Sequence, residues 1–170
     1  MKICIVGLGL IGGSLAKAIK KNTHESCFGI DIDRGTIAGA LAQEAIDGEM
    51  TIDDLAGCDV VIVGLHPEAT IKFITENAGK FKKGGIVLDT CGVKGEIVRA
   101  VEDVCIENGV NFLGCHPMAG IFRLCILGGQ SFREGKLYND AYRQNAYEGC
   151  AGDIEACIQH RFCKGRCIKR

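Results

Sequence analysis

The 170-residue sequence has no apolar run long enough to cross a bilayer and no excess of either charge. A membrane-spanning helix needs about 20 consecutive apolar residues, so we do not expect a membrane role. Lys and Arg number 20 against 21 Asp and Glu, and the net charge of −1 argues against wholesale nucleic-acid binding. The chain also lacks signal-peptide features and opens directly into the β-rich stretch Lys2–Val6. We therefore expect a cytoplasmic globular protein.

The length allows one sizeable hydrophobic core and is too short for two ordinary domains. Eleven cysteines would indicate a disulfide framework in a short secreted chain. Six of them are instead scattered through residues 1–120, at positions that we predict to lie inside strands or helices. We interpret these six as small buried hydrophobes in a reducing compartment.

The composition changes near residue 120. Residues 1–120 hold 11 Lys and Arg against 16 Asp and Glu, whereas residues 121–170 hold 9 against 5. All three tyrosines and five of the eleven cysteines lie after residue 120, and no sustained apolar period of 2 or 3.6 is present there. We therefore divide the chain into a domain over residues 1–120 and an atypical tail over residues 121–170.

Strand and helix patterns alternate regularly within residues 1–120. The predicted strands cover residues 2–6, 27–31, 49–52, 60–63, 86–88 and 111–113, the third being the weakest. The helices between them carry apolar stripes made by Ile11, Leu15, Ala18 and Ile19, by Ile37, Leu41 and Ala45, and by Ile97, Val101, Val104 and Cys105. Such alternation predicts βαβ units and an α/β fold of the Rossmann type, with a doubly wound parallel sheet.

A glycine-rich motif lies between the first predicted strand and the first predicted helix, and reads Gly7-Leu8-Gly9-Leu10-Ile11-Gly12. In this context the first glycine allows a tight turn, the second lets the backbone approach a pyrophosphate, and the third lets the helix pack on the strand. The N-terminus of the helix then offers free N–H groups to the phosphates. We assign these six residues to dinucleotide binding.

Asp31 supports this assignment, because it ends the second predicted strand 19 residues beyond Gly12. A carboxylate there accepts hydrogen bonds from an adenosine ribose and repels a 2′-phosphate, which favours NAD over NADP. Arg34 lies close by and softens that preference, since it could offer a cation to a phosphate. The NAD preference thus depends on Asp31 alone.

Two further segments follow the fifth and sixth predicted strands, at the edge where ligands bind in an open parallel sheet. They read Asp-Thr-Cys-Gly-Val-Lys-Gly-Glu-Ile over residues 89–97 and Gly-Cys-His-Pro-Met-Ala-Gly over residues 114–120. Together with Gly-Leu-Gly-Leu-Ile-Gly-Gly-Ser over residues 7–14, they make residues 1–120 closely resemble the prephenate dehydrogenase family, including its arogenate-using relatives. The His-Pro-Met-Ala-Gly string is the most specific part of this resemblance.

The resemblance implies an NAD-dependent oxidative decarboxylation of prephenate to 4-hydroxyphenylpyruvate in tyrosine biosynthesis. His116 matches the catalytic histidine of the family, and its imidazole suits holding the substrate hydroxyl and accepting the proton near neutral pH. The family also has a helical C-terminal domain that forms a homodimer and supplies much of the substrate-carboxylate binding. We find no counterpart of that domain in the sequence and expect the chain to be truncated, which leaves its activity open.

The loops around the expected nicotinamide site depart from the family pattern. Many members carry a serine where this chain has Gly92, which cannot donate that hydrogen bond, so Thr90, Cys91 or a water would have to substitute. We assign Thr90 and Cys91 to the cofactor, and Gly92 with His116 to the substrate. Leu65, after the fourth predicted strand, is also assigned to the cofactor, whereas its neighbour His66 and Lys94 are interpreted as a loop residue and the start of a helix.

The tail carries a cluster of Cys157, His160, Cys163 and Cys167, which suggests zinc ligation. The spacing fits no ligand pattern that we trust, and we assign no metal. Codons for residues 122–168 can instead be chosen so that the frame displaced by one nucleotide resembles what the family places after its His-Pro-Met-Ala-Gly segment. We therefore hypothesise a frameshift near residues 120–121 and expect residues 121–170 to be poorly ordered or non-native.

Two alternative functions remain open at this point. Another small NAD(P)-dependent dehydrogenase or reductase, of the hydroxyacid or imino-acid type, would share residues 1–90 and act on a different substrate. A non-catalytic module that senses dinucleotides or binds a metal through its cysteines would bind its ligand without turnover. The choice between prephenate and arogenate is not determined by this sequence.

Overall fold

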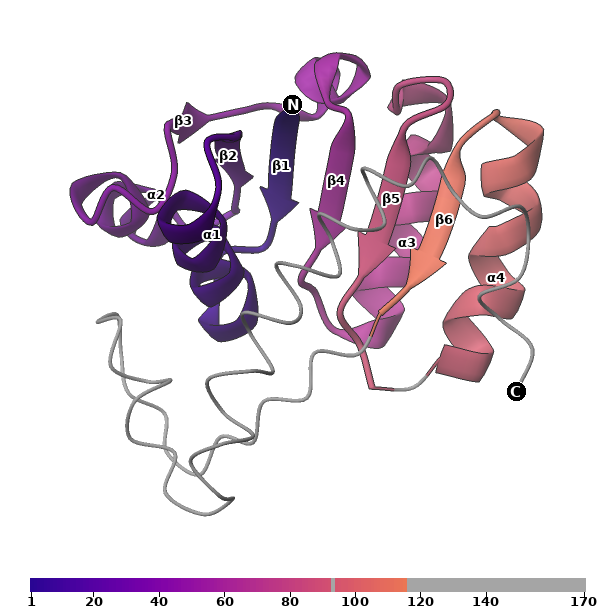
Figure 1. The fold of residues 1–170 in the computed structure, drawn as a ribbon. Helices are drawn as coiled ribbons and strands as arrows, with labels where there is room; N and C mark the ends of the chain where they lie inside the picture. Colours follow the sequence, from indigo (N-terminus) through magenta and orange to yellow (C-terminus); the bar gives the residue numbers. More distant parts are fainter. Residues whose placement is uncertain (93, 116–170) are drawn as a thin grey trace.

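A computed structural model describes residues 1–92 and 94–115. Its centre is a six-stranded parallel sheet with strand order β3-β2-β1-β4-β5-β6, shown in Figure 1. The strands are β1 (Lys2–Val6), β2 (Ser26–Ile30), β3 (Gly48–Glu49), β4 (Val60–Val63), β5 (Ile86–Asp89) and β6 (Asn111–Gly114). The order reverses between β1 and β4, which is the topological switch point where doubly wound sheets bind ligands.

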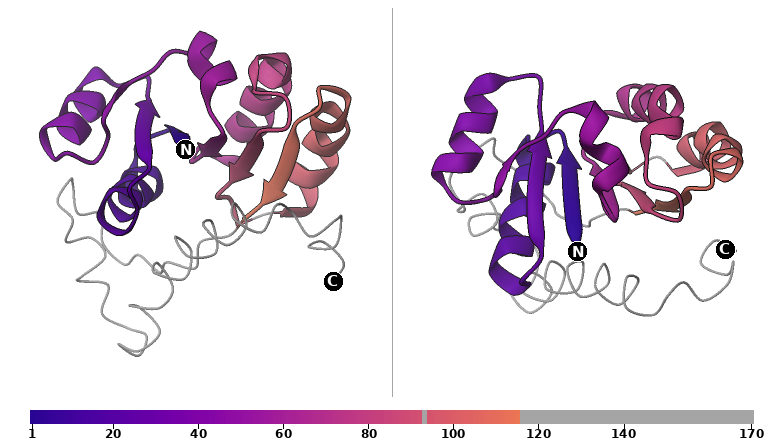
Figure 2. Two further views of the ribbon diagram at one scale, coloured as in Figure 1. Left: turned by 45° about the horizontal axis from the view of Figure 1, so that its top comes forward. Right: turned by 90° about the horizontal axis from the view of Figure 1, so that it is seen from above.

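Two helices cover each face of the sheet (Figures 1 and 2). The helices are α1 (Leu10–Asn22), α2 (Arg34–Ala42), α3 (Pro67–Asn77) and α4 (Lys94–Glu107), and the 3-10 segments are η1 (Ile52–Gly57) and η2 (Ala78–Lys80). Ile3 and Ile5 of β1 pack in the core beneath α1 and α2, whereas Cys4 and Val6 pack in the core beneath α3 and α4. Because successive strand side chains alternate between faces, a strand buried on both faces is a continuous apolar run.

The apolar runs predicted the central strands correctly, and the edge of the sheet less well. β3 ends at Glu49, and Ile52 begins η1 and is partly exposed, so the strand predicted over residues 49–52 was wrong after its first residue. A capping box explains the change, because Thr51 and Asp54 bond each other's groups and start a helical turn instead.

The predicted stripe on the second helix was also wrong in part. Ile37 is buried, but Leu41 is 41% exposed, and Ala45 is buried beyond the end of α2. The helix ends in a Schellman arrangement, in which the Ala45 N–H donates to the Ala40 carbonyl and Glu44 adopts a left-handed φ of 53°. This turn carries Ala45 back to the core and leaves Leu41 at the surface.

The six cysteines of the described residues are free thiols, five buried and Cys115 partly buried. Three lie inside β1, β2 and α4, and three lie just beyond the ends of η1, β5 and β6. Burial raises the pKa of Cys27 to about 12 and that of Cys105 to about 11, so both thiols are protonated near neutral pH. The interpretation of these cysteines as buried hydrophobes therefore holds for five of the six, whereas their predicted position inside a strand or helix is wrong for Cys58, Cys91 and Cys115.

No helix among residues 1–92 and 94–115 has the length and apolar character needed to traverse a bilayer. The predicted tail, its cysteine and histidine cluster and the domain boundary at residue 120 all lie outside the described residues. Those predictions stay predictions.

Candidate nucleotide-binding site

The tight turn that follows β1 is built from glycines. Gly7 has a φ of +85°, and its N–H donates to the Ile30 carbonyl at 2.8 Å, which ties the turn to β2. A Cβ on Gly12 would lie 1.9 Å from the Gly7 carbonyl oxygen, so helix α1 can pass this close to the turn only with glycine there. Gly64, after β4, lies against the same turn, since a Cβ there would lie 3.1 Å from the Gly7 oxygen. The turn therefore depends on glycine for space as well as for backbone conformation.

The middle glycine of the motif has a different environment. Gly9 is exposed, and a Cβ added to it would meet no atom within 4 Å. It is the N-cap of α1, where no side chain caps the helix and no acidic residue lies in the first turn. Among the described residues no side chain therefore occupies the N-terminus of α1, which leaves its first N–H groups and positive dipole end available to a pyrophosphate.

The remaining motif residues play structural roles around this opening. Leu8 is buried among α1, α2 and the sheet, while Leu10 and Ile11 in the first turn of α1 are partly buried. Leu8 also fills the space above Gly29 of β2, where a Cβ would lie 2.5 Å from its side chain. These three residues shape the opening, and the backbone of the motif lines it.

Asp31 directly follows β2 and lies beside the glycine turn. One carboxylate oxygen accepts the Leu8 N–H at 2.7 Å, and the other accepts the Asp33 N–H at 2.9 Å. These bonds fix the orientation of the carboxylate while leaving the side chain partly exposed. Each oxygen retains lone pairs that could accept a ribose hydroxyl.

Arg34, which could have served a 2′-phosphate, is already paired. Its guanidinium forms an ion pair with the carboxylate of Glu49 on β3. Asp33 precedes it as the N-cap of α2 and accepts from the Gly35 N–H at 2.9 Å and from the Thr36 hydroxyl at 2.9 Å. The Thr36 hydroxyl, and then the Gly35 N–H, hold the pKa of Asp33 below its usual range.

The loop between β4 and α3 covers the opposite side of the glycine turn. The Leu65 side chain lies against Gly7, since a Cβ on that glycine would be 2.7 Å from Leu65 Cδ2. His66 is exposed and is the N-cap of α3, and Pro67 takes the first helical position as expected. Leu65 is therefore partly buried beside the glycine turn, and its assignment to the cofactor stays a prediction.

The loop between β5 and α4 contains Thr90, Cys91 and Gly92. Thr90 is 6% exposed, and its hydroxyl donates to the Val63 carbonyl at 3.4 Å. Cys91 is 7% exposed, with Sγ 3.2 Å from the Leu65 carbonyl and 3.5 Å from the Thr70 hydroxyl. Both side chains thus connect β5 to the β4–α3 segment, whereas Gly92 is exposed.

One buried carboxylate orders this region, and no role was predicted for it from the sequence. Asp89, the last residue of β5, is fully buried, and its two oxygens accept the Cys91 N–H at 3.0 Å and the Cys115 N–H at 3.2 Å. Cys115 directly precedes His116 in the sequence. Asp89 therefore connects the β5–α4 loop to the segment that leads to the predicted catalytic histidine, which itself lies outside the described residues.

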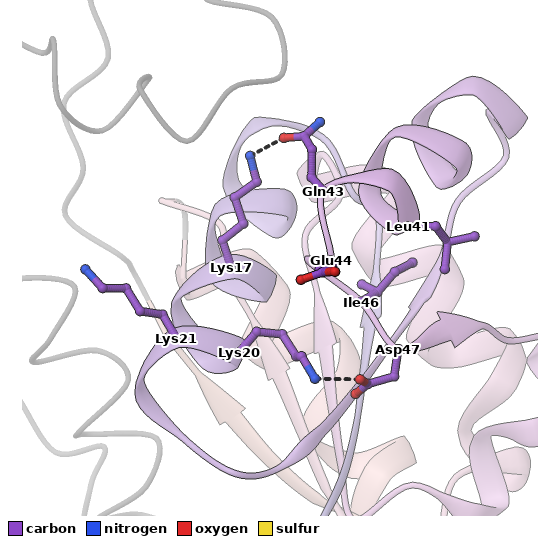
Figure 3. Close-up of a pocket in the computed structure, with 8 residues that line it drawn as sticks. All are labelled: Lys17, Lys20, Lys21, Leu41, Gln43, Glu44, Ile46 and Asp47. Atoms are coloured by element: carbon purple, nitrogen blue, oxygen red, sulfur yellow. Dashed lines mark hydrogen bonds and ion pairs between the residues drawn. The ribbon is translucent and has the colours of Figure 1, made fainter.

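A surface groove lies away from this site, between α1 and the segment that joins α2 to β3 (Figure 3). Its volume is about 630 Å³, and Figure 3 shows ion-paired or hydrogen-bonded lysines on its wall, Lys20 with Asp47 and Lys17 with Gln43. It contains none of the residues that the sequence analysis assigned to cofactor or substrate. The glycine turn and its neighbouring loops are the better candidate site.

Comparison with known proteins identifies the family of the domain that holds this candidate site. The family model described as prephenate dehydrogenase, nucleotide-binding domain, matches residues 15–132. The chain is 31% identical over 143 residues to prephenate dehydrogenase of Bacillus subtilis and 29% identical over 144 residues to that of Lactococcus lactis. These matches cover 82% and 83% of this chain but only 38% and 39% of the relatives, so the chain spans well under half their length.

A solved structure with the same fold is prephenate dehydrogenase from Aquifex aeolicus in complex with hydroxyphenyl propionate and NAD⁺. It superposes with a TM-score of 0.64 at 24% identity and covers 91% of this chain and 57% of that one. At this identity the likeness establishes the fold, and the family follows from the match to residues 15–132. The chain belongs to the prephenate dehydrogenase family and carries its nucleotide-binding domain.

Proposed function

We propose that this protein binds NAD and takes part in the oxidative decarboxylation of prephenate to 4-hydroxyphenylpyruvate. The observation that carries the proposal is the open cradle at Gly9 between the uncapped start of α1 and the oriented carboxylate of Asp31. The NAD⁺ in the Aquifex aeolicus structure of the same fold supports this choice of cofactor. The curated relatives support prephenate as the substrate.

Two groups of residues at the same edge of the sheet would bind the two ends of the dinucleotide. The backbone of residues 7–12 would bind the pyrophosphate, and Asp31 would accept hydrogen bonds from the adenosine ribose. Leu65, Thr90 and Cys91 would border the nicotinamide end, Leu65 by direct packing and the other two by holding the loops together. When bound, the nicotinamide supplies the hydride acceptor.

His116 is proposed as the base that holds the substrate hydroxyl and accepts its proton. An imidazole exchanges a proton near neutral pH, which suits this role. Asp89 supports it indirectly, because its carboxylate fixes the N–H of Cys115, the residue before the histidine. Gly92 is exposed in the β5–α4 loop and is proposed to border the substrate, with no side chain to donate a hydrogen bond.

The test is binding followed by turnover, on the chain as it exists. Calorimetric titration with NAD⁺ should give saturable binding that Gly9→Val abolishes, because its side chain would fill the cradle. Absorbance of the reduced nicotinamide should then rise when prephenate is added to the wild type. The rate of this rise should be at least tenfold lower for His116→Asn. Turnover with arogenate but not with prephenate would show that arogenate is the substrate. Binding of NAD⁺ without any turnover would favour a non-catalytic dinucleotide module.

Residues 121–170 carry a separate proposal, that their reading frame is displaced by one nucleotide. Resequencing of the codons for residues 119–123 tests it directly. A lost or gained base is the expected result, whereas stoichiometric zinc in protein prepared in metal-free buffer would favour the cluster of Cys157, His160, Cys163 and Cys167 instead. The family resemblance further suggests a homodimer, which sedimentation analysis would detect.

A further inference from the structure

More carboxylates gather at the end of β2 than the single one that binding of a ribose requires. Asp31, Asp33 and Glu49 carry three negative charges around one cation, Arg34. Asp33 is linked to Asp31 through its own N–H, which donates to the Asp31 carboxylate at 2.9 Å. A local excess of two negative charges therefore lies beside the position expected for the adenosine ribose.

Glu49 reaches this region from the neighbouring strand. In the β2–β3 register it pairs with Gly29, two residues before Asp31, so β3 brings it to the same end of the sheet. Its carboxylate forms the ion pair with Arg34 in the first turn of α2. Both side chains are exposed, at 38% for Glu49 and 78% for Arg34, so solvent and a ligand can reach them.

Asp33 removes a second source of attraction for a phosphate. The N-terminus of α2 would present free N–H groups, but the Asp33 carboxylate accepts the Gly35 N–H and the Thr36 hydroxyl there. The start of this helix therefore already carries an anion. An additional phosphate would meet like charge instead of an open helix dipole.

We infer that Glu49 and Asp33 are specificity-determining residues that exclude a 2′-phosphate from the adenosine end of the site. Glu49 neutralises the one guanidinium that would attract such a phosphate, and Asp33 occupies the helix N-terminus beside it. The inference rests on the proposed dinucleotide binding and deepens it. It makes the preference for NAD over NADP a property of four charged side chains instead of Asp31 alone.

The experiment compares the Kd of NAD⁺ and NADP⁺ for the full chain and its variants, by calorimetric titration at low salt. Glu49→Gln keeps the shape of the side chain and removes its charge, so the affinity for NADP⁺ should rise about fivefold or more, from Coulomb attraction at this range. The affinity for NAD⁺ should change less than about twofold, since the ribose hydroxyl carries no charge.

Two further variants separate the contributions. Asp33→Asn retains an oxygen that caps α2 and should also raise the affinity for NADP⁺, because asparagine is as good an N-cap as aspartate. Adding Arg34→Gln to Glu49→Gln should remove most of the gain, because the freed guanidinium is then absent. The gain should also shrink at high salt, which a purely structural effect would not show.

Glu76→Gln is the matched control, since Glu76 is an exposed, ion-paired glutamate on α3, far from α2 in the fold. It should leave both affinities unchanged. Selective binding of NAD⁺ by the wild type with no change of the ratio in Glu49→Gln or Asp33→Asn would overturn this inference alone. Binding of neither dinucleotide by the folded wild type would overturn the proposed function and this inference with it.

Discussion

The glycine turn between β1 and α1 and the loop between β5 and α4 lie at the same edge of the sheet but are held in opposite ways. The glycine turn is shaped by missing side chains, with Gly12 against the Gly7 carbonyl and open space at Gly9. The β5–α4 loop is shaped by buried polar side chains, those of Asp89, Thr90 and Cys91. The difference matches two tasks, because phosphates need backbone N–H groups in an empty cradle and reacting groups need fixed positions.

Gly12→Ala should have the largest effect on the glycine turn. Its Cβ would lie 1.9 Å from the Gly7 oxygen, so α1 would have to move off the sheet. We expect the free energy of unfolding to fall by about 3 kcal/mol, measured by urea denaturation. Gly9→Ala is the matched control, where open space limits the loss to about 1 kcal/mol from the poorer N-cap. Equal losses in the two variants would show that the turn is not governed by space.

Asp89→Ala should have the next largest effect, on the other loop. The substitution leaves the buried N–H group of Cys91 without its carboxylate acceptor, whereas the Cys115 N–H keeps its second acceptor, the main-chain carbonyl of residue 89. We expect a loss of about 2 kcal/mol in the free energy of unfolding, because an unsatisfied buried donor is destabilising. Hydrogen exchange should also accelerate at the Cys91 amide and not at the Leu8 amide beside Asp31. Unchanged exchange at Cys91 would contradict the proposed ordering of the loop.

Cys91 offers a milder change in the same loop. Cys91→Ala removes the contacts of Sγ with the Leu65 carbonyl and the Thr70 hydroxyl, and should lower the free energy of unfolding by about 1 kcal/mol. Cys91→Ser keeps a donor at that position and should lower it less. Chemical denaturation of the pair checks this, and identical losses would mean that the thiol acts only through its volume.

The smallest effect should be the part of the acid response that comes from Asp47, which ties α1 to β2. The Lys20 ammonium at 2.5 Å, and then the Cys27 N–H at 2.7 Å, hold the pKa of Asp47 below its usual range. Because the pKa is lower in the folded state, the stabilisation is complete above the unfolded value of about 3.9 and is lost as the pH falls through the folded value. Asp47→Asn should therefore flatten the loss of stability in acid. A melting series below about pH 4 in both proteins measures it, and parallel curves would exclude this contribution.

The sequence predicts the parts of the fold whose cause is local. Continuous apolar runs identified β1, β4 and β5, because the central positions of strands buried on both faces take apolar side chains. The end of α2 was missed because the left-handed position is held by Glu44, whereas glycine or asparagine is the usual signal. Two-residue β3 was too short to show any period.

The same distinction holds for the candidate site. The glycine motif and Asp31 were found from spacing, since their function follows from chain order alone. The ion pair of Arg34 with Glu49 was not found, because its partners are 15 residues apart and meet only through the β2–β3 pairing. The role of Asp89 was missed in the same way, since Cys115 lies 26 residues away. An aspartate directly before α2 was the one available signal for the cap at Asp33.

The buried free thiols are built-in probes of local opening of the fold. A thiol reacts with an alkylating reagent as the thiolate, and Cys27 and Cys105 are both shielded and held protonated while the sheet and α4 are closed. Their labelling rates therefore report how often each region opens, Cys27 for the β2 side of the sheet and Cys105 for the α4 side. Without any introduced probe, the two halves of the molecule can be timed separately in one mass-spectrometric experiment.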